Sequence, residues 1–211
     1  MCGLDFQTEL NYIQVEIVVL NLFVYVYVHI AAAKPAAAAA PAKPKPEPLP
    51  EVEIGLKEIN VAITDSEGKV KASGRWPLLI DEAERVPVFI RHRDFNNLNA
   101  IDPNDMQPEK IRLGLLGAMR YNKPFTMNLG ESGSLDIIVD RFNEVLPGLL
   151  DMVLDKSILQ EENFRKLIKD SDGTEYTQIW GLGDQFIVVF VSSNPAPTEE
   201  TKGRLLVFRV Q

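Results

Sequence analysis

The sequence predicts an α/β domain of three layers, in which helices cover both faces of a mostly parallel sheet. Short apolar runs, each too brief for a helix, alternate in the first half of the chain with segments of helical spacing. These predicted strands lie near residues 76, 98, 125, 187 and 206. The run over 185–193 is strongly apolar and rich in β-branched residues, which is typical of a strand buried on both faces.

The composition excludes several classes of function. The chain has 211 residues and a formal net charge of −8, and its acidic balance argues against nucleic-acid binding, which needs clustered Lys and Arg. One cysteine, Cys2, cannot form an internal disulfide, and two histidines, His29 and His92, are too few for a Cys/His metal cluster. We therefore expect a cytoplasmic protein that holds no metal or other cofactor.

Residues 1–30 form an apolar N-terminal segment. A membrane-spanning helix needs about 20 uncharged apolar residues, and Glu16 and Asn21 shorten the run over 12–30 well below that. A signal peptide fits poorly as well, because no Lys or Arg precedes the apolar stretch. Two interpretations stay equally open: a strand that a partner covers, or a segment that is absent from the natural protein. We do not expect a membrane protein.

Residues 31–50 are rich in Ala, Pro and Lys. Repeated proline prevents the alanine run from forming a helix, so this linker is expected to be an extended spacer. The folded domain is therefore predicted to comprise residues 51–211.

The first part of this domain shows a period of two. Apolar and polar residues alternate over 52–56 and again over 59–63, and residues 64–69 have the composition of a turn before the short segment 70–73. This pattern predicts a β-hairpin or two edge strands.

The most informative stretch is the strand predicted at 77–80 and the loop that follows it. Pro87 is well placed near the start of the next helix. In a P-loop nucleoside triphosphatase this loop holds phosphate with Gly, Lys and Ser or Thr. Here the loop instead carries Asp81, Glu82 and Glu84. The sequence therefore predicts a P-loop-like fold that lacks a phosphate-binding loop.

The middle of the chain continues the alternation. A strand is predicted at 98–101, followed by an Asp-Pro-Asn-Asp turn expected to cap the next helix. That helix is predicted at 108–120, where Gly114 and Gly117 indicate close packing against the sheet. A further strand is predicted at 124–129.

The last part contains shorter elements. Helical spacing over 135–156 is interrupted by a Pro-Gly pair and predicts two helices or one broken helix. A short helix is expected at 161–170, a small strand at 176–180, and the last strand at 205–210.

Four segments together resemble a known family. They are the Arg-Trp-Pro-Leu-Leu-Ile-Asp sequence at 75–81, Phe89-Ile90, the Leu-Leu-Gly-Ala sequence at 115–118, and the strand ending in Asn-Pro over 185–195. The stretch 74–197 is similar to the ATP-binding dynein motor region, the fifth AAA+ module of dynein heavy chains, as found at the C-terminus of IQ-motif and ankyrin-repeat proteins.

The resemblance implies an AAA+-like fold and a role without catalysis, since this module does not hydrolyse ATP in dyneins and serves as a structural, force-transmitting element. We therefore expect no enzymatic activity. The expected partners are proteins associated with dynein, microtubules or cilia, and the expected location is the cytoplasm, with the cilium or cytoskeleton as candidates. The family's Pro-Gln-Gly-Gln-Ala loop is replaced here by residues 82–86.

The resemblance also indicates where a vestigial nucleotide site would lie. Its candidate residues are Asp81, Glu82, Arg85 and Asn194, although an exposed acidic loop and a turn-capping Asn194 are the simpler interpretations. The alternative function is a degenerate nucleoside triphosphatase that still binds ATP or ADP, through Arg85, Arg91 or Asn194, with help from a partner.

Overall fold

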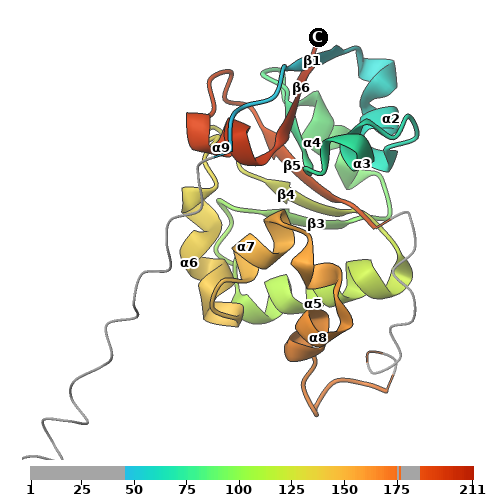
Figure 1. Cartoon of the computed structure of the whole chain (residues 1–211), viewed down its shortest axis with the longest axis vertical. Helices are drawn as coiled ribbons and strands as arrows, with labels where there is room; N and C mark the ends of the chain where they lie inside the picture. The colour runs from blue at the N-terminus through green and yellow to red at the C-terminus, as the bar shows by residue number, and fades with distance from the viewer. Residues whose placement is uncertain (1–45, 175, 177–185) are drawn as a thin grey trace, which may run out of the picture. The chain divides into compact units, whose positions relative to one another are not determined.

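Six parallel strands form the central sheet of the computed structural model, which describes residues 46–174, 176 and 186–211 (Figure 1). The strand order is β1-β6-β2-β5-β4-β3. The strands are β1 (Val52–Ile54), β2 (Pro77–Ile80), β3 (Asn96–Asn99), β4 (Phe125–Asn128), β5 (Val188–Ser192) and β6 (Leu206–Val210). The expectations for residues 1–30, for most of the linker and for a strand at 177–180 lie outside the described residues.

Helices cover both faces of this sheet, which confirms the predicted three-layer α/β fold. Figure 1 shows α5, α6, α7 and α8 gathered on one side of the sheet and α2, α3 and α4 on the other. The helices are α2 (Ile59–Thr64), α3 (Lys69–Ser73), α4 (Arg85–Arg91), α5 (Pro108–Tyr121), α6 (Asp136–Val145), α7 (Leu149–Leu154), α8 (Glu161–Phe164) and α9 (Glu199–Arg204). Short 3₁₀ turns lie at Leu56–Glu58, Ser157–Leu159 and Arg165–Leu167.

The core lies along the central strands. All residues of β2 and β5 are buried, as expected for parallel strands covered on both faces. Leu79 of β2 pairs with Val191 of β5 on one side and with Phe208 of β6 on the other. Strands that follow one another along the sequence are therefore not always neighbours in the sheet.

The prediction of a β-hairpin or two edge strands over 51–73 is wrong except for β1, which is an edge strand of the sheet. Only β1 is a strand, and Val52 pairs in parallel with Phe208 near the other end of the described domain. Residues Ile59, Ala62 and Ile63 are buried together on α2, a spacing of three and four that the period-two reading overlooked. The turn after α2 leads into another helix, because the Asp65 carboxylate accepts the N–H groups of Val70 and Lys71 in the first turn of α3.

The prediction for α5 is confirmed. Ile111, Leu115 and Leu116 are fully buried on its inner face. Gly114 lies so close to the sheet that a Cβ at this position would be 3.2 Å from the Phe125 ring. This close approach explains why the helix tolerates glycine.

The turn before α5 differs from its expected role. The Asp105 carboxylate does not cap α5; it accepts the backbone N–H of Asn99 at 2.9 Å and pairs with Lys110. Asn99 is the last residue of β3, which begins at Asn96, two residues before the predicted start. Asp105 therefore protects the open edge of this strand.

Other boundaries shifted by small amounts. Helix α4 begins at Arg85, before Pro87, and the predicted break over 135–156 separates α6 from α7. Helix α9 was not predicted; it is short, and its first turn is capped by the Thr198 hydroxyl, which accepts the N–H of Thr201. Among the described residues, the helices are all too short or too polar to cross a membrane.

Candidate functional site

The carboxyl ends of the strands are where open α/β sheets bind ligands. Here the loops after β2, β4 and β5 surround an open hollow of about 560 Å³. It is lined by Glu82, Ala83, Glu84, Glu131, Ser193, Asn194 and Pro195. A phosphate loop would occupy the same corner, between β2 and α4.

Asp81 follows β2 directly, and its side chain is fully buried. One carboxylate oxygen accepts the backbone N–H of Val86, in the first turn of α4, at 2.7 Å. The other accepts Nε and Nη2 of Arg85 at 3.1 and 3.0 Å. Asp81 therefore takes up the two kinds of group, a helix-start N–H and a cation, that a bound phosphate would use.

Arg85 is also held by the end of the sheet. Its guanidinium donates to the carbonyl oxygens of Val210 and Gln211 at 3.5 and 3.3 Å. The Asp81–Arg85 pair thus connects the start of α4 to the end of β6. The arrangement stabilises a corner of the fold and leaves little of this cation for a ligand.

A second cation near the hollow is engaged in the same way. Arg209 on β6 lies beside Ile80 in the parallel register. Its guanidinium pairs with Glu51 and donates to the carbonyl oxygen of Pro195 at 3.0 Å. The hydrogen bond that Arg209 donates to the Glu51 carboxylate raises the pKa of Arg209 above its ordinary value.

The hollow itself is acidic. Glu82, Glu84 and Glu131 line it, and all three are exposed. Like charges so close together repel an incoming anion. The backbone at Glu84 has a positive φ of 54°, so this loop takes a conformation favoured by glycine without having one.

Asn194 is a capping residue, as its simpler interpretation predicted. Its Oδ1 accepts the N–H of Ala196 at 2.8 Å, and its Nδ2 donates to the carbonyl oxygen of Ser132 at 3.2 Å. The Nδ2 bond joins the exit of β5 to the loop after β4, and the Oδ1 bond stabilises the turn that follows β5.

The structure thus brings Asp81 and Arg85 into direct contact and places Glu82 and Asn194 on one hollow. Within residues 46–174, 176 and 186–211, no group of three or more His, Cys, Asp or Glu side chains is placed to share a metal ion.

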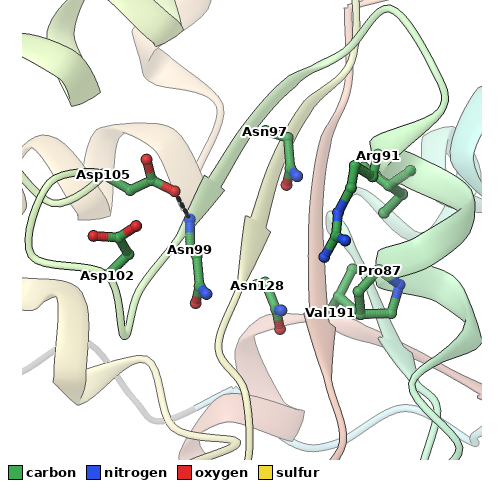
Figure 2. A pocket seen from close by; sticks show the side chains of 9 residues that line it. Pro87, Arg91, Asn97, Asn99, Asp102, Asp105, Asn128 and Val191 are labelled. Atoms are coloured by element: carbon green, nitrogen blue, oxygen red, sulfur yellow. Dashed lines mark hydrogen bonds between the residues drawn. The ribbon is translucent and has the colours of Figure 1, made fainter.

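Sequence reasoning missed a second cavity, of about 200 Å³, between α4 and the ends of β3 and β4 (Figure 2). It is lined by Pro87, Ile90, Arg91, Asn97, Asn99, Asp102, Asp105, Asn128 and Val191. The available signal was the repeat of asparagine at Asn97 and Asn99, a period of two that places both side chains on one face of a strand. That Asn128 joins them depends on the pairing of β3 with β4.

No protein-family model matches the chain.

Proposed function

We propose that this chain is a catalytically inactive, dynein-like AAA+ module that acts as a structural or protein-interaction domain in a microtubule-based or ciliary assembly. Its partners are proteins, and nucleic acids and membranes are not among them. The observation that carries the proposal is the buried Asp81 carboxylate, which accepts the Val86 N–H and binds the Arg85 guanidinium.

This contact supports the loss of nucleotide binding for a simple reason. Phosphate binding at this corner needs free backbone N–H groups, a free cation and no competing negative charge. In this chain an internal carboxylate already has the Val86 N–H and the Arg85 cation, and Glu82 and Glu84 add negative charge to the hollow. A triphosphate would have to displace one anion and approach two others.

The same features weigh against catalysis. Phosphoryl transfer depends almost entirely on positioning and on stabilising the charge of the transferred group. The loop over 81–84 provides neither Lys nor Gly for this purpose. The module keeps the packed sheet and helices that a structural role requires.

A thermal-shift titration of the full-length chain with Mg²⁺ and ATP, ADP or GTP tests the first part of the proposal. We expect no change in melting temperature at millimolar nucleotide, and no hydrolysis above a heat-inactivated control. Binding at tenfold saturation would stabilise the folded state by about 1.4 kcal/mol, which such a titration detects. A concentration-dependent rise would overturn the proposal and favour the degenerate nucleoside triphosphatase.

The location is tested separately by imaging the tagged full-length chain in ciliated cells. We expect enrichment on microtubules or in the cilium. An even distribution through the cytosol would contradict the proposed assembly and leave the conclusion on catalysis intact, so the two parts of the proposal fail independently.

A further inference from the structure

The cavity between α4 and the ends of β3 and β4 differs from the acidic hollow in its chemistry, and what it binds does not depend on the proposed function. Figure 2 shows Arg91 on one side of it, Asp102 and Asp105 on the other, and asparagine side chains between them. Its volume of about 200 Å³ suits a small polar group and not a nucleotide.

Asn99 and Asn128 are the last residues of β3 and β4, and they pair in the parallel register. Each uses its Oδ1 to accept the N–H two residues later, from Ile101 at 3.1 Å and from Gly130 at 2.9 Å. These backbone donors determine the orientation of both amides, because only an oxygen accepts a hydrogen bond. Their two Nδ2 groups have no acceptor among the described residues.

Asn97 adds a third amide on the same face of β3. Its Oδ1 accepts the hydroxyl of Thr126 at 2.9 Å, and Thr126 is fully buried beside it on β4. In this arrangement the Asn97 Nδ2 also lacks an acceptor within the part of the chain that the structure describes.

Arg91, the last residue of α4, provides the positive charge. Figure 2 shows its side chain directed from the helix toward the strands that carry the asparagines. No hydrogen bond or ion pair joins its guanidinium to any described residue. The neighbouring Arg93 lies instead over the Phe89 ring, 4.7 Å from its centre.

These groups share one property, since all four offer N–H donors and one of them carries charge. A ligand that accepts several hydrogen bonds and bears a single negative charge fits them best. A doubly charged phosphate fits less well for two reasons. Asp102 and Asp105 lie on the far side of the same cavity and repel negative charge, and Lys110 is bound to Asp105 and so is not a second free cation for the ligand. We propose that this cavity binds a carboxylate group, borne by a small organic acid or by an acidic side chain of a peptide.

The test is a titration of the ¹⁵N-labelled full-length chain, followed by NMR through the side-chain amide signals. The probes are sodium acetate and the blocked peptide acetyl-Ser-Glu-Ser-amide, each against sodium chloride of the same ionic strength. We expect saturable shifts of the Nδ2 signals of Asn97, Asn99 and Asn128 and of the Arg91 Nε signal. Asn143 is an internal reference, because its Oδ1 also accepts a backbone N–H and it lies on α6.

Two substitutions invert the chemistry and preserve the turns. Asn99→Asp and Asn128→Asp keep an oxygen for the Ile101 and Gly130 N–H groups and replace each free NH₂ with negative charge, so we expect them to abolish carboxylate binding. Asn143→Asp is the matched control and leaves binding unchanged.

The contribution of the Arg91 charge is tested by a second matched pair of variants, at the last residue of α4 and two residues after it. Arg91→Gln removes a charged donor and is expected to weaken binding about tenfold or more, and Arg93→Gln is expected to leave it unchanged.

The proposal is overturned if neither acetate nor the blocked peptide produces saturable shifts up to roughly 100 mM, since ligands of so few atoms bind in the millimolar range. It is also overturned if inorganic phosphate binds more tightly than acetate, or if both matched controls weaken binding as much as the cavity variants. Shifts with the blocked peptide assign the site to a peptide-borne carboxylate; shifts with acetate alone assign it to a free acid, and both results support the proposal.

Discussion

Two corners of the same sheet edge use their polar groups in opposite ways. At the β2–α4 corner, Asp81 accepts the helix N–H of Val86 and the Arg85 guanidinium, so the donors are satisfied within the chain. At the β3–β4 corner, the oxygens of Asn99 and Asn128 are satisfied within the chain and their NH₂ groups are left open. At the β2–α4 corner, where a nucleotide would be expected, the donors are occupied, and we call it the closed corner. At the β3–β4 corner the NH₂ donors are free, and we call it the open corner.

Position on a fold therefore does not by itself establish a binding site. Helix α4 illustrates this, because it begins with Arg85 and ends with Arg91. One guanidinium is held by Asp81 and the end of β6, and the other has no partner among the described residues. Which hydrogen-bonding groups remain available decides what a corner of the sheet can bind.

The largest effect on stability is expected at Arg112, whose guanidinium is fully bonded within the chain. Arg112 on α5 has a side chain only 4% exposed, and it binds Glu109, Asp172 and the Leu167 carbonyl oxygen. Arg112→Met removes this buried guanidinium together with its hydrogen bonds to two carboxylates and one carbonyl oxygen, and we expect a loss of about 3 kcal/mol in the free energy of unfolding. Urea denaturation measures this loss.

The matched control for that prediction is Arg141→Met, since Arg141 forms an exposed pair with Glu144 on α6. We expect its effect to stay below about 0.5 kcal/mol. Similar losses from both variants would contradict the distinction between engaged and exposed arginines.

The Arg112 cluster also predicts a smaller, pH-dependent effect. Hydrogen bonds from Arg112 lower the pKa of Glu109 from 4.5 to about 2 and the pKa of Asp172 from 3.8 to about 2. Because the folded-state pKa values lie below those of the unfolded chain, the stabilisation is present above about pH 4.5 and is lost as the pH falls toward 2. Urea midpoints between pH 5 and pH 2 measure it.

In that acid titration, Arg112→Met is expected to show a shallower fall in stability than the natural chain. Parallel curves for the two proteins would show that the cluster does not contribute to the pH dependence.

At the closed corner, Asp81→Ala is expected to lower the free energy of unfolding by about 2 kcal/mol. The substitution leaves the Val86 N–H and the Arg85 guanidinium without their acceptor, and partial exposure of Arg85 limits the loss. Chemical denaturation measures this loss, and Glu82→Ala is the control. Glu82 is exposed, so its substitution is expected to change the free energy of unfolding by less than about 0.5 kcal/mol. Equal effects would mean that the corner is not held together by Asp81.

The smallest effect on the free energy of unfolding is expected at the open corner. It is measured by comparing substitutions at the two ends of α4. Arg91→Gln is predicted to change the free energy of unfolding by less than about 0.5 kcal/mol, whereas Arg85→Gln loses contacts to Asp81 and β6 and is predicted to cost about 1 kcal/mol. Thermal and urea unfolding of both variants checks the order. A larger loss for Arg91→Gln would show that its guanidinium has an internal partner.

The sequence alone determined the features that rest on local chemistry. The strands at β2, β4, β5 and β6 were predicted because a short apolar run buried on both faces has a composition of its own. Helix α5 was predicted because its length gives the helical period several turns in which to repeat. The absence of a phosphate loop followed from the residue types between 81 and 84.

Features that depend on the pairing of distant residues followed only from the folded structure. Residues 59–63 fit a period of two and a helical period equally well, and it is their burial on α2 that distinguishes the two. The Arg85 contact to Gln211 and the pairing of Asn99 with Asn128 join residues far apart in the chain. Strand order and register bring such groups together, and these are set by the packing of the whole sheet, which no local pattern of residues contains.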